Sequence, residues 1–157
     1  MILRKAELKD FEVYKKMFED KEGLFHWIYY DESDSNMEEY NQEDFSDILK
    51  EYENYTLEEF EKNLKIDYIF MIEEYRQIVG YLRFFNTGTK GDYKIAEWAM
   101  INPNDDENKR TVIEWLLKTK LPRLRSFSIC TPFERVGNFL LSNGFIQESA
   151  YFYKLKV

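Results

Sequence analysis

Apolar residues at helical spacing dominate the first part of the chain. Residues 1–6 form a strand-like run, and apolar residues three or four positions apart predict helices around 11–18 and 42–53. The capping-box pattern of Thr56 and Glu59 then opens a third helix. Up to this point the sequence therefore predicts a mainly helical segment.

The pattern changes to strand-like runs after residue 66. Two β-rich runs, 67–74 and 77–85, are separated by two residues and predict an antiparallel hairpin. The later elements are a strand at 93–101, a helix through Val112 and Leu116, a strand at 124–130, a helix stopped by Asn143 and Gly144, and strands in 145–149 and 150–157. This order, β-α-α-α-β-β-β-α-β-α-β-β, predicts one α/β domain over 1–157 with a mixed sheet and helices on both faces.

The charge is unevenly distributed. Residues 31–61 carry 13 acids and one base, Lys50, which gives −12, so the rest of the chain carries +4 of the total of −8. Residues 23–37, aromatic and then acidic, are expected to form a loop. Such a split suits a protein that meets an anion on one side and a cation on the other, although a solvated acidic helix face is the plainer interpretation.

Composition excludes several functional classes. A single cysteine, Cys130, rules out an intramolecular disulfide, and with one histidine, His26, no metal site is expected. The acidic balance argues against a nucleic-acid binder, and no apolar run is long enough to cross a membrane. We therefore expect a cytoplasmic protein without nucleic-acid or membrane partners.

Four local stretches resemble the GNAT superfamily of N-acyltransferases. The opening "ILRKAELKDFEVY" is similar to its first strand and helix, and "IVGYLRFF" is similar to a strand in which glycine follows two apolar residues. "AEWAMINP" resembles the strand that runs into the cofactor loop, and "FERVGNFLLSNGF" resembles the closing helix. The resemblance implies a mostly antiparallel sheet whose fourth and fifth strands part in a V.

In this family acetyl-CoA lies in that V, held by the main chain of the fourth strand and by amides of the loop after it. The positions of the family's loop glycines hold Lys109 and Thr111 in this sequence. The residues that the resemblance assigns to acetyl-CoA binding are Met100, Ile101, Asn108, Lys109, Arg110 and Thr111.

The residues at the start of the following helix also favour a different arrangement. Asp105, Asp106, Glu107 and Asn108 are all good residues for the first turn or the N-cap of a helix. A carboxylate that caps the helix uses the same amides that a diphosphate would need. The sequence leaves both an anion cradle and an ordinary capped helix open.

Glu97 is the candidate proton acceptor. Strand alternation places it on one face with Ala99, opposite Trp98 and Met100. The resemblance implies a carboxylate on this strand that receives the proton of the amine, and a solvent-facing or paired strand glutamate is the alternative. Leu140 occupies the family's tyrosine position, so Tyr151, Tyr153 or Ser128 are candidates for protonating the departing thiolate.

Two functions follow. The first is an N-acetyltransferase that transfers an acetyl group from acetyl-CoA to a primary amine of a cationic acceptor, a small molecule or a basic peptide, by direct attack. The second is a catalytically inactive GNAT-like binding or interaction module. In that case the aromatic residues Phe25, Trp27, Tyr29 and Tyr30 would form a partner or homodimer surface.

Overall fold

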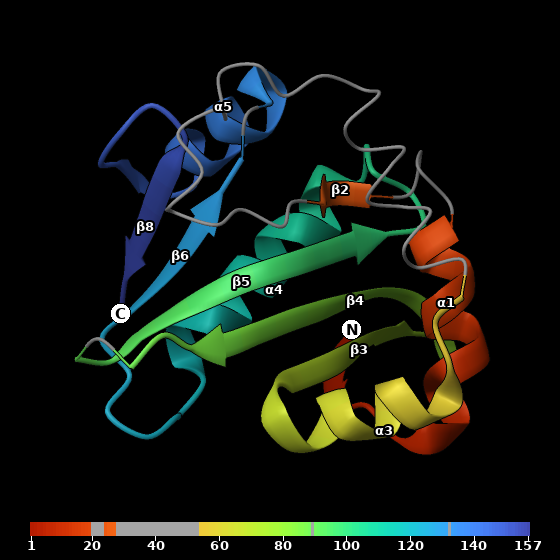
Figure 1. Ribbon diagram of the computed structural model, residues 1–157. Coiled ribbons are helices and arrows are strands. Elements are labelled where there is room, and N and C mark those ends of the chain that lie inside the picture. Colours follow the sequence, from red (N-terminus) through yellow and green to blue (C-terminus); the bar gives the residue numbers. More distant parts are fainter. Residues whose placement is uncertain (20–23, 28–53, 89, 132) are drawn as a thin grey trace.

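The computed structural model describes residues 1–19, 24–27, 54–88, 90–131 and 133–157 (Figure 1). The strands are β1 (Ile2–Lys5), β2 (Leu24–Trp27), β3 (Tyr68–Glu74), β4 (Gln77–Asn86), β5 (Asp92–Met100), β6 (Ser126–Cys130), β7 (Ile146–Gln147) and β8 (Phe152–Lys156). The helices are the 3-10 turn η1 (Leu8–Asp10), α1 (Phe11–Glu19), α3 (Leu57–Ile66), α4 (Asp106–Lys118) and α5 (Glu134–Ser142). None of the helices in these ranges is long and apolar enough to cross a membrane.

The strands form one mixed sheet in the order β1-β3-β4-β5-β6-β8-β7, with β2 paired to β5 outside this path. The β5–β6 pair is parallel and the other pairs are antiparallel. The predicted mixed, mostly antiparallel α/β sheet is therefore confirmed. The parallel pair lies in the centre of the sheet, where the chain crosses over through α4.

Helices cover both faces of the sheet, as predicted (Figure 1). On one face α1 and α3 pack through Tyr14 and Phe60 against Tyr81 and Ala99. On the other face α4 and α5 bury Val112, Ile113, Leu116, Val136 and Leu140 against the alternate residues of β4, β5 and β6. The two cores follow from the two-residue period of the strands, which sends neighbouring side chains to opposite faces.

Local sequence signals explain where the elements begin and end. The Thr56 hydroxyl accepts a hydrogen bond from the Glu59 amide at the start of α3, so the predicted capping box is present. Gly144 follows the C-cap of α5 with a φ of 95°, a conformation that favours glycine. Gly80 lets β4 approach β5, because a Cβ at this position would lie 2.3 Å from the Ala99 carbonyl oxygen.

The segment 23–53 was predicted to contain a loop and a helix. Part of the expected loop over 23–37 is a strand, because Leu24–Trp27 pairs with β5. The reason is tertiary: a free edge of β5 supplies hydrogen-bonding groups that the sequence of the loop does not reveal. The helix expected near 42–53 and most of the acidic segment 31–61 lie outside the described residues.

Candidate active site

The strands β5 and β6 pair over only part of their length. Their parallel ladder joins Asp92–Ile95 to Ser126–Ile129 and goes no further. Beyond this point β5 continues to Met100 and the two strands diverge (Figure 1). The helix α4 follows the end of β5, and α5 follows the end of β6, so both helices begin where the strands have parted.

The short strand β2 pairs with the parted end of β5. Leu24 aligns with Ala99 and Trp27 with Glu97 in an antiparallel ladder. The same part of β5 is paired with β4 on its other edge, through Glu97 opposite Arg83. A strand has only two edges, so β2 must lie on the edge that faces β6. The main-chain groups of Glu97–Ala99 on that edge are therefore already engaged by a segment of this chain.

A bulge in β5 sets the direction of the Glu97 side chain. Phe84 aligns with Ile95 whereas Arg83 aligns with Glu97, so Ala96 is an extra residue. Without it, Glu97 would share the α4–α5 face with Ile95. With it, Glu97 contacts Tyr14 of α1 on the opposite face, while Trp98 and Met100 lie in the α4–α5 core. The predicted opposition of Glu97 to Trp98 and Met100 is confirmed.

Both carboxylate oxygens of Glu97 have hydrogen-bond donors. The Tyr14 hydroxyl donates to Oε2 at 2.7 Å, and Nη1 of Arg83 donates to Oε1 at 3.2 Å. The residue is 6% exposed. Burial raises the pKa of Glu97 above its ordinary value of 4.5, and the opposing influence of Arg83 and of the Tyr14 and Tyr81 hydroxyls is smaller. A raised pKa suits a proton acceptor that works near neutral pH.

The first turn of α4 is capped by a carboxylate. Asp105 is the N-cap residue, and its Oδ1 accepts a hydrogen bond from the Asn108 amide at 3.0 Å. The Asn108 side-chain amide donates to Asp105 and to Glu74. Of the two arrangements left open by the sequence, the structure contains the capped helix, with Asp105 as the capping residue. The Asn108 amide is thus occupied in this state.

Lys109 is a buried cation that ties the loop to both helices. Its ammonium donates to the Pro103 carbonyl at 2.8 Å, forms an ion pair with Asp106 at 2.8 Å, and lies 4.6 Å from the centre of the Phe139 ring in α5. Only 4% of the residue is exposed. The charge of Lys109 is balanced locally by Asp106, and its side chain connects α4 with the Phe139 ring of α5.

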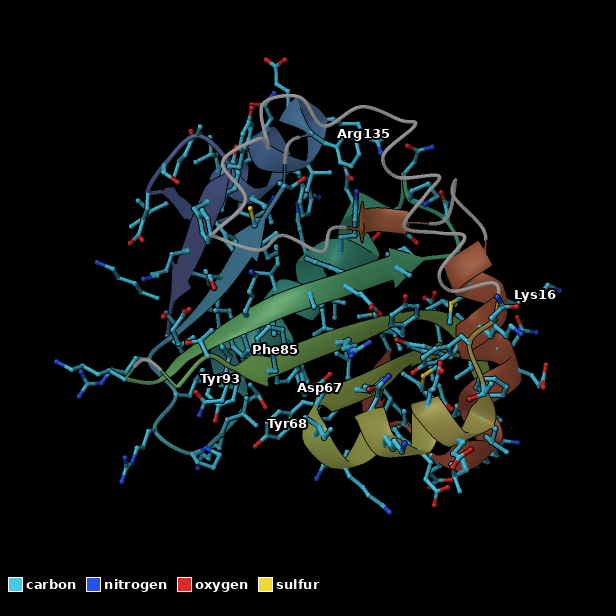
Figure 2. All side chains as sticks on the ribbon, viewed as in Figure 1. Lys16, Asp67, Tyr68, Phe85, Tyr93 and Arg135 are labelled. Atoms are coloured by element: carbon cyan, nitrogen blue, oxygen red, sulfur yellow. The ribbon has the colours of Figure 1, made fainter. Side chains whose placement is uncertain are left out.

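A groove of about 440 Å³ lies between the start of α4 and α5. Asp106, Lys109, Arg110, Arg135, Asn138 and Phe139 contribute to its wall. Arg110 and Arg135 are both exposed, and Figure 2 labels Arg135 on α5. Since Lys109 and Asp106 neutralise one another, the two arginines leave the groove with a net positive charge, which suits an anionic ligand.

The remaining predicted cofactor residues lie close to this groove or at the end of β5. Met100 is buried and aligned with Gly80 of β4. Ile101 is exposed, and its amide donates to the Val79 carbonyl of β4 at 2.8 Å. The Thr111 hydroxyl donates to the Glu107 carbonyl inside α4. Arg110 is thus the member of the predicted set whose charged group is exposed in the groove.

The comparisons with known proteins concern the fold. No protein-family model and no curated protein matches this sequence. Among solved structures, the PaiA N-acetyltransferase from Thermoplasma acidophilum in complex with coenzyme A superimposes with a TM-score of 0.66 at 13% identity, over 99% of this chain and 98% of that one. A GNAT-family protein from Desulfovibrio desulfuricans gives a TM-score of 0.61 at 13% identity, over 99% and 98%. A variant of the SpeG spermidine N-acetyltransferase from Vibrio cholerae gives 0.60 at 10% identity, over 99% and 92%.

The chain has the GNAT fold. The matches cover nearly all of this chain and nearly all of the matched chains, so the resemblance extends over the whole arrangement of sheet and helices. At 10–13% identity the likeness defines the fold, and the chemistry has to be argued from the residues of this chain.

The sequence offers three candidates for protonating a thiolate: Ser128, Tyr151 and Tyr153. Tyr151 is half-buried and packs against the core on the α1–α3 face. Ser128 donates its hydroxyl to Asp92 at 2.9 Å, at the closed end of the β5–β6 pair. Tyr153 is buried, and its hydroxyl lies where a Cβ on Gly137 of α5 would be 2.1 Å away. Burial raises the pKa of Tyr153, with smaller contributions from Cys130 and Glu134, so its phenol stays protonated. The geometry favours Tyr153 over Ser128 for a donor near α5.

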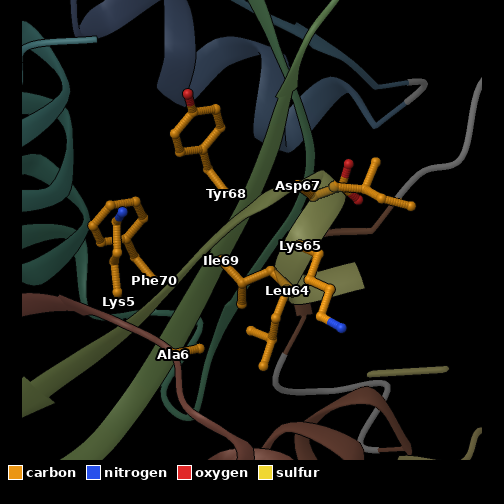
Figure 3. A pocket seen from close by; sticks show the side chains of 9 residues that line it. Lys5, Ala6, Leu64, Lys65, Asp67, Tyr68, Ile69 and Phe70 are labelled. Atoms are coloured by element: carbon orange, nitrogen blue, oxygen red, sulfur yellow. The ribbon is translucent and has the colours of Figure 1, made fainter. Parts of the chain in front are cut away.

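A second hollow, of about 250 Å³, lies at the end of α3 beside β1 (Figure 3). Its two lysines, Lys5 and Lys65, point in different directions, and Lys5 lies along Phe70. The Asp67 carboxylate is bound to Arg83. The charged groups of this hollow do not converge on a common point, so it lacks the arrangement of a ligand site.

Sequence reasoning missed four residues of the site: Tyr14, Asp67, Arg83 and Arg135. Arg83 had a detectable signal, because an arginine inside the otherwise apolar run "IVGYLRFF" requires an anionic partner if the strand is buried. Asp67 and Glu97 are those partners. Tyr14 lies in the predicted helix around 11–18 and Arg135 in the predicted closing helix, and nothing in the sequence indicates their neighbours.

Proposed function

We propose that this chain is an acyl-CoA-dependent N-acetyltransferase that transfers an acetyl group from acetyl-CoA to a primary amine of a cationic acceptor by direct attack. The observation that carries the proposal is the early end of the β5–β6 ladder at Ile95 and Ile129, in a GNAT fold. Two parted strands leave an edge of β5 with which an extended ligand can pair once β2 has left it. The basic groove between α4 and α5 opens at the same end of the strands.

The residues present fit the anionic part of acetyl-CoA. Arg110 and Arg135 are exposed cations on facing helices, and they would hold its phosphates. The remaining cofactor positions, Met100, Ile101 and Asn108 to Thr111, stay proposals that rest on their place around β5 and α4. When bound, acetyl-CoA supplies a thioester whose acyl carbon an amine can attack.

The proposed contribution of the chain to the reaction is to accept a proton from the amine and to donate one to the thiolate. A cationic acceptor must lose a proton before its nitrogen is nucleophilic. Glu97 is the proposed acceptor of that proton, directly or through water, which is supported by its buried carboxylate beside Tyr14 and Arg83. The raised pKa of Glu97 brings its basicity closer to that of the acceptor than an ordinary carboxylate. Tyr153 keeps its phenolic proton near the start of α5 and is our candidate donor to the leaving thiolate.

A cationic acceptor is favoured by charge. The segment 31–61 carries −12, and in the Glu97 cluster two carboxylates, Glu97 and Asp67, surround one guanidinium, Arg83. One neighbour in fold is a spermidine N-acetyltransferase, which by its name acts on a polyamine. A small amine or a basic peptide is the proposed acceptor class. The cytoplasmic location and the homodimer stay predictions.

The strand β2 sets a condition on this proposal. Because β2 pairs with the edge of β5 that faces β6, a ligand that extends along Glu97–Ala99 must replace it. We therefore expect acetyl-CoA binding to include the release of Leu24–Trp27 from β5. Four residues form only a short ladder, so the cost of this release is small compared with the contacts of a nucleotide ligand.

Calorimetric titration with acetyl-CoA tests the proposal. Binding with a Kd in the micromolar range, and acetylation of spermidine with an acceptor KM that rises with ionic strength, are the expected results. No heat at millimolar acetyl-CoA would refute the enzyme. An acceptor KM that is indifferent to salt would refute the cationic acceptor alone.

The second candidate function is an inactive GNAT-like interaction module. Two observations favour it specifically: β2 occupies the edge of β5, and Asp105 occupies the Asn108 amide. In this case the slot is filled permanently by the chain itself. The same titration separates the two, because a module that has lost its cofactor shows no binding at any accessible concentration.

A further inference from the structure

Arg83 and Glu97 face each other across the β4–β5 ladder. They are directly aligned in the register: the bulge at Ala96 turns Glu97 toward the α1–α3 face, and Arg83 lies on the same face by alternation with Tyr81. Cross-strand neighbours have fixed backbone positions, so the distance between these two side chains is set by the sheet itself. The register of β4 and β5 therefore brings Nη1 of Arg83 and Oε1 of Glu97 to 3.2 Å.

Asp67 holds the guanidinium in one orientation. Its Oδ2 accepts from Nε of Arg83 at 2.8 Å and from Nη2 at 2.6 Å, which leaves Nη1 for Glu97. Asp67 is the C-cap residue of α3 and directly precedes β3, so a helix end and a strand start fix its position. Figure 2 shows it between α3 and the sheet. Because the guanidinium is planar, binding its Nε and Nη2 to Asp67 fixes the direction in which Nη1 donates.

Several further groups face the carboxylate of Glu97. Tyr14 donates from α1, Tyr81 lies beside it on β4, and Tyr55 acts at longer range from the segment before α3. His26 is the titratable residue of β2, and its backbone aligns with Trp98. Among the described groups that contact Glu97, Arg83 is the cation. Without it, two buried carboxylates would share the site with neutral phenols only.

We propose that Arg83, oriented by Asp67, is a positioning residue that keeps Glu97 ionised and aimed as the proton acceptor of the transfer reaction. This inference rests on the proposed function. The physical basis of the inference is that the adjacent Arg83 cation favours the ionised form of Glu97, while the neighbouring Asp67 carboxylate disfavours it. The three side chains are 15%, 10% and 7% exposed for Arg83, Asp67 and Glu97, so water screens these interactions weakly.

The test compares Arg83→Met, which keeps the length of the side chain without its charge, with Arg83→Lys, which keeps the charge without the fork. Arg125→Met serves as the control, because Arg125 is exposed and lies near the end of β8 away from the cluster. The first readout is kcat/KM for acetyl transfer as a function of pH. The second is the ¹³C chemical shift of the Glu97 carboxylate, assigned by its loss in Glu97→Gln.

In Arg83→Met, the acid limb of the pH profile and the Glu97 titration are both expected to move up by roughly 1–3 pH units. The rate at neutral pH then falls, because a smaller fraction of Glu97 is in the basic form. Arg83→Lys is expected to restore part of the shift, and Arg125→Met none of it. A rate that falls equally at all pH values, with an unchanged Glu97 titration, would show a merely structural role and overturn the inference.

The two readouts also separate this inference from the proposed function. If the wild-type chain transfers no acetyl group, the proposed function fails, and with it the role of Glu97 as an acceptor of the amine proton. The carboxylate titration then still decides the electrostatic part: an upward shift in Arg83→Met supports the control of Glu97 by Arg83, and no shift contradicts it. If Arg83→Met does not fold, Arg83→Lys carries the same measurement, with a smaller upward shift expected, whereas Asp67→Asn removes a negative charge beside Glu97 and is expected to shift the titration downward.

Discussion

Two polar regions of this molecule differ in their burial and in how their charges are balanced. The Glu97 cluster, formed by Glu97, Arg83, Asp67 and Tyr14, lies buried on the α1–α3 face, and its charges are paired by residues of the chain. The α4–α5 groove lies at the other face and presents Arg110 and Arg135 to solvent. In the buried cluster the charges are paired within the chain, whereas the charges of the exposed groove can pair with a bound anion.

This difference predicts how each region responds to change. Removing one member of the buried cluster leaves a charge without its partner in a poorly screened site, so folding and chemistry suffer together. Removing a groove arginine leaves no buried charge, so only ligand binding changes. The comparison fails if the two regions respond alike, and the substitutions below test it from the largest expected effect to the smallest.

Arg83→Met is expected to have the largest effect. Loss of the guanidinium leaves Asp67 and Glu97 close together and unpaired, and breaking such a buried pair costs roughly 3–5 kcal/mol in the free energy of unfolding. Chemical denaturation measures the change. The exposed Arg125→Met control is expected to stay within about 0.5 kcal/mol of the wild type. Equal decreases in the free energy of unfolding of the two variants would contradict the cost assigned to the unpaired buried charges.

The double substitution of Arg110 and Arg135 to Met is expected to weaken acetyl-CoA binding by about tenfold, through two charge-assisted contacts of modest strength each. The salt dependence of the Kd should decrease as well, because fewer charges remain to be screened. Calorimetry at two ionic strengths measures both. The free energy of unfolding should stay nearly unchanged, and a large destabilisation would contradict the division into two regions.

How much of this picture the sequence predicts depends on the range of the signals. The helix α3 and the end of α5 were predicted because Thr56, Glu59 and Gly144 act on their own neighbourhood. The order of strands and helices along the chain followed from the same local patterns, and the parting of the fourth and fifth strands followed from the GNAT resemblance. The face of Glu97 was also predicted, since alternation over 97–100 is intact.

What the sequence could not show is the set of contacts between distant segments. The partners of Glu97 come from positions 14 and 83, and the bulge at Ala96 that brings them together has no marker such as glycine. The strand β2 forms because β5 has a free edge, and "LFHW" carries no alternation that predicts it. The choice between a cap and a cradle depended on which acid reached the Asn108 amide, and Asp105 does.

Asp105 allows a finer test of the groove. Asp105→Ala removes the cap of α4 and is expected to cost about 1 kcal/mol of stability, while Asp105→Asn keeps a capping oxygen and should cost less than half of this. Both remove a negative charge near the groove, so both should tighten acetyl-CoA binding several-fold if the phosphates lie there. Thermal denaturation and calorimetry give the two numbers. Unchanged affinity in both variants would place the phosphates elsewhere.

The smallest expected effect is a dependence of stability on pH that originates in Glu97. Its pKa is raised by burial above the ordinary 4.5, so its contribution to stability is complete below pH 4.5 and is lost as the pH rises through the folded-state value. Glu97→Gln does not titrate, so its stability relative to the wild type should improve as the pH rises through this range. A difference that stays constant with pH would contradict the raised pKa.

Hydrogen exchange with and without acetyl-CoA tests the central claim most directly, because it reads the main-chain groups of the parted strand. The account predicts that acetyl-CoA protects the amides of β5 near Glu97–Ala99 or keeps them protected, while Leu24–Trp27 exchange faster as β2 leaves the edge of β5. An exchange pattern unchanged in both segments at saturating acetyl-CoA would contradict it, because the edge of β5 would then belong to β2 alone.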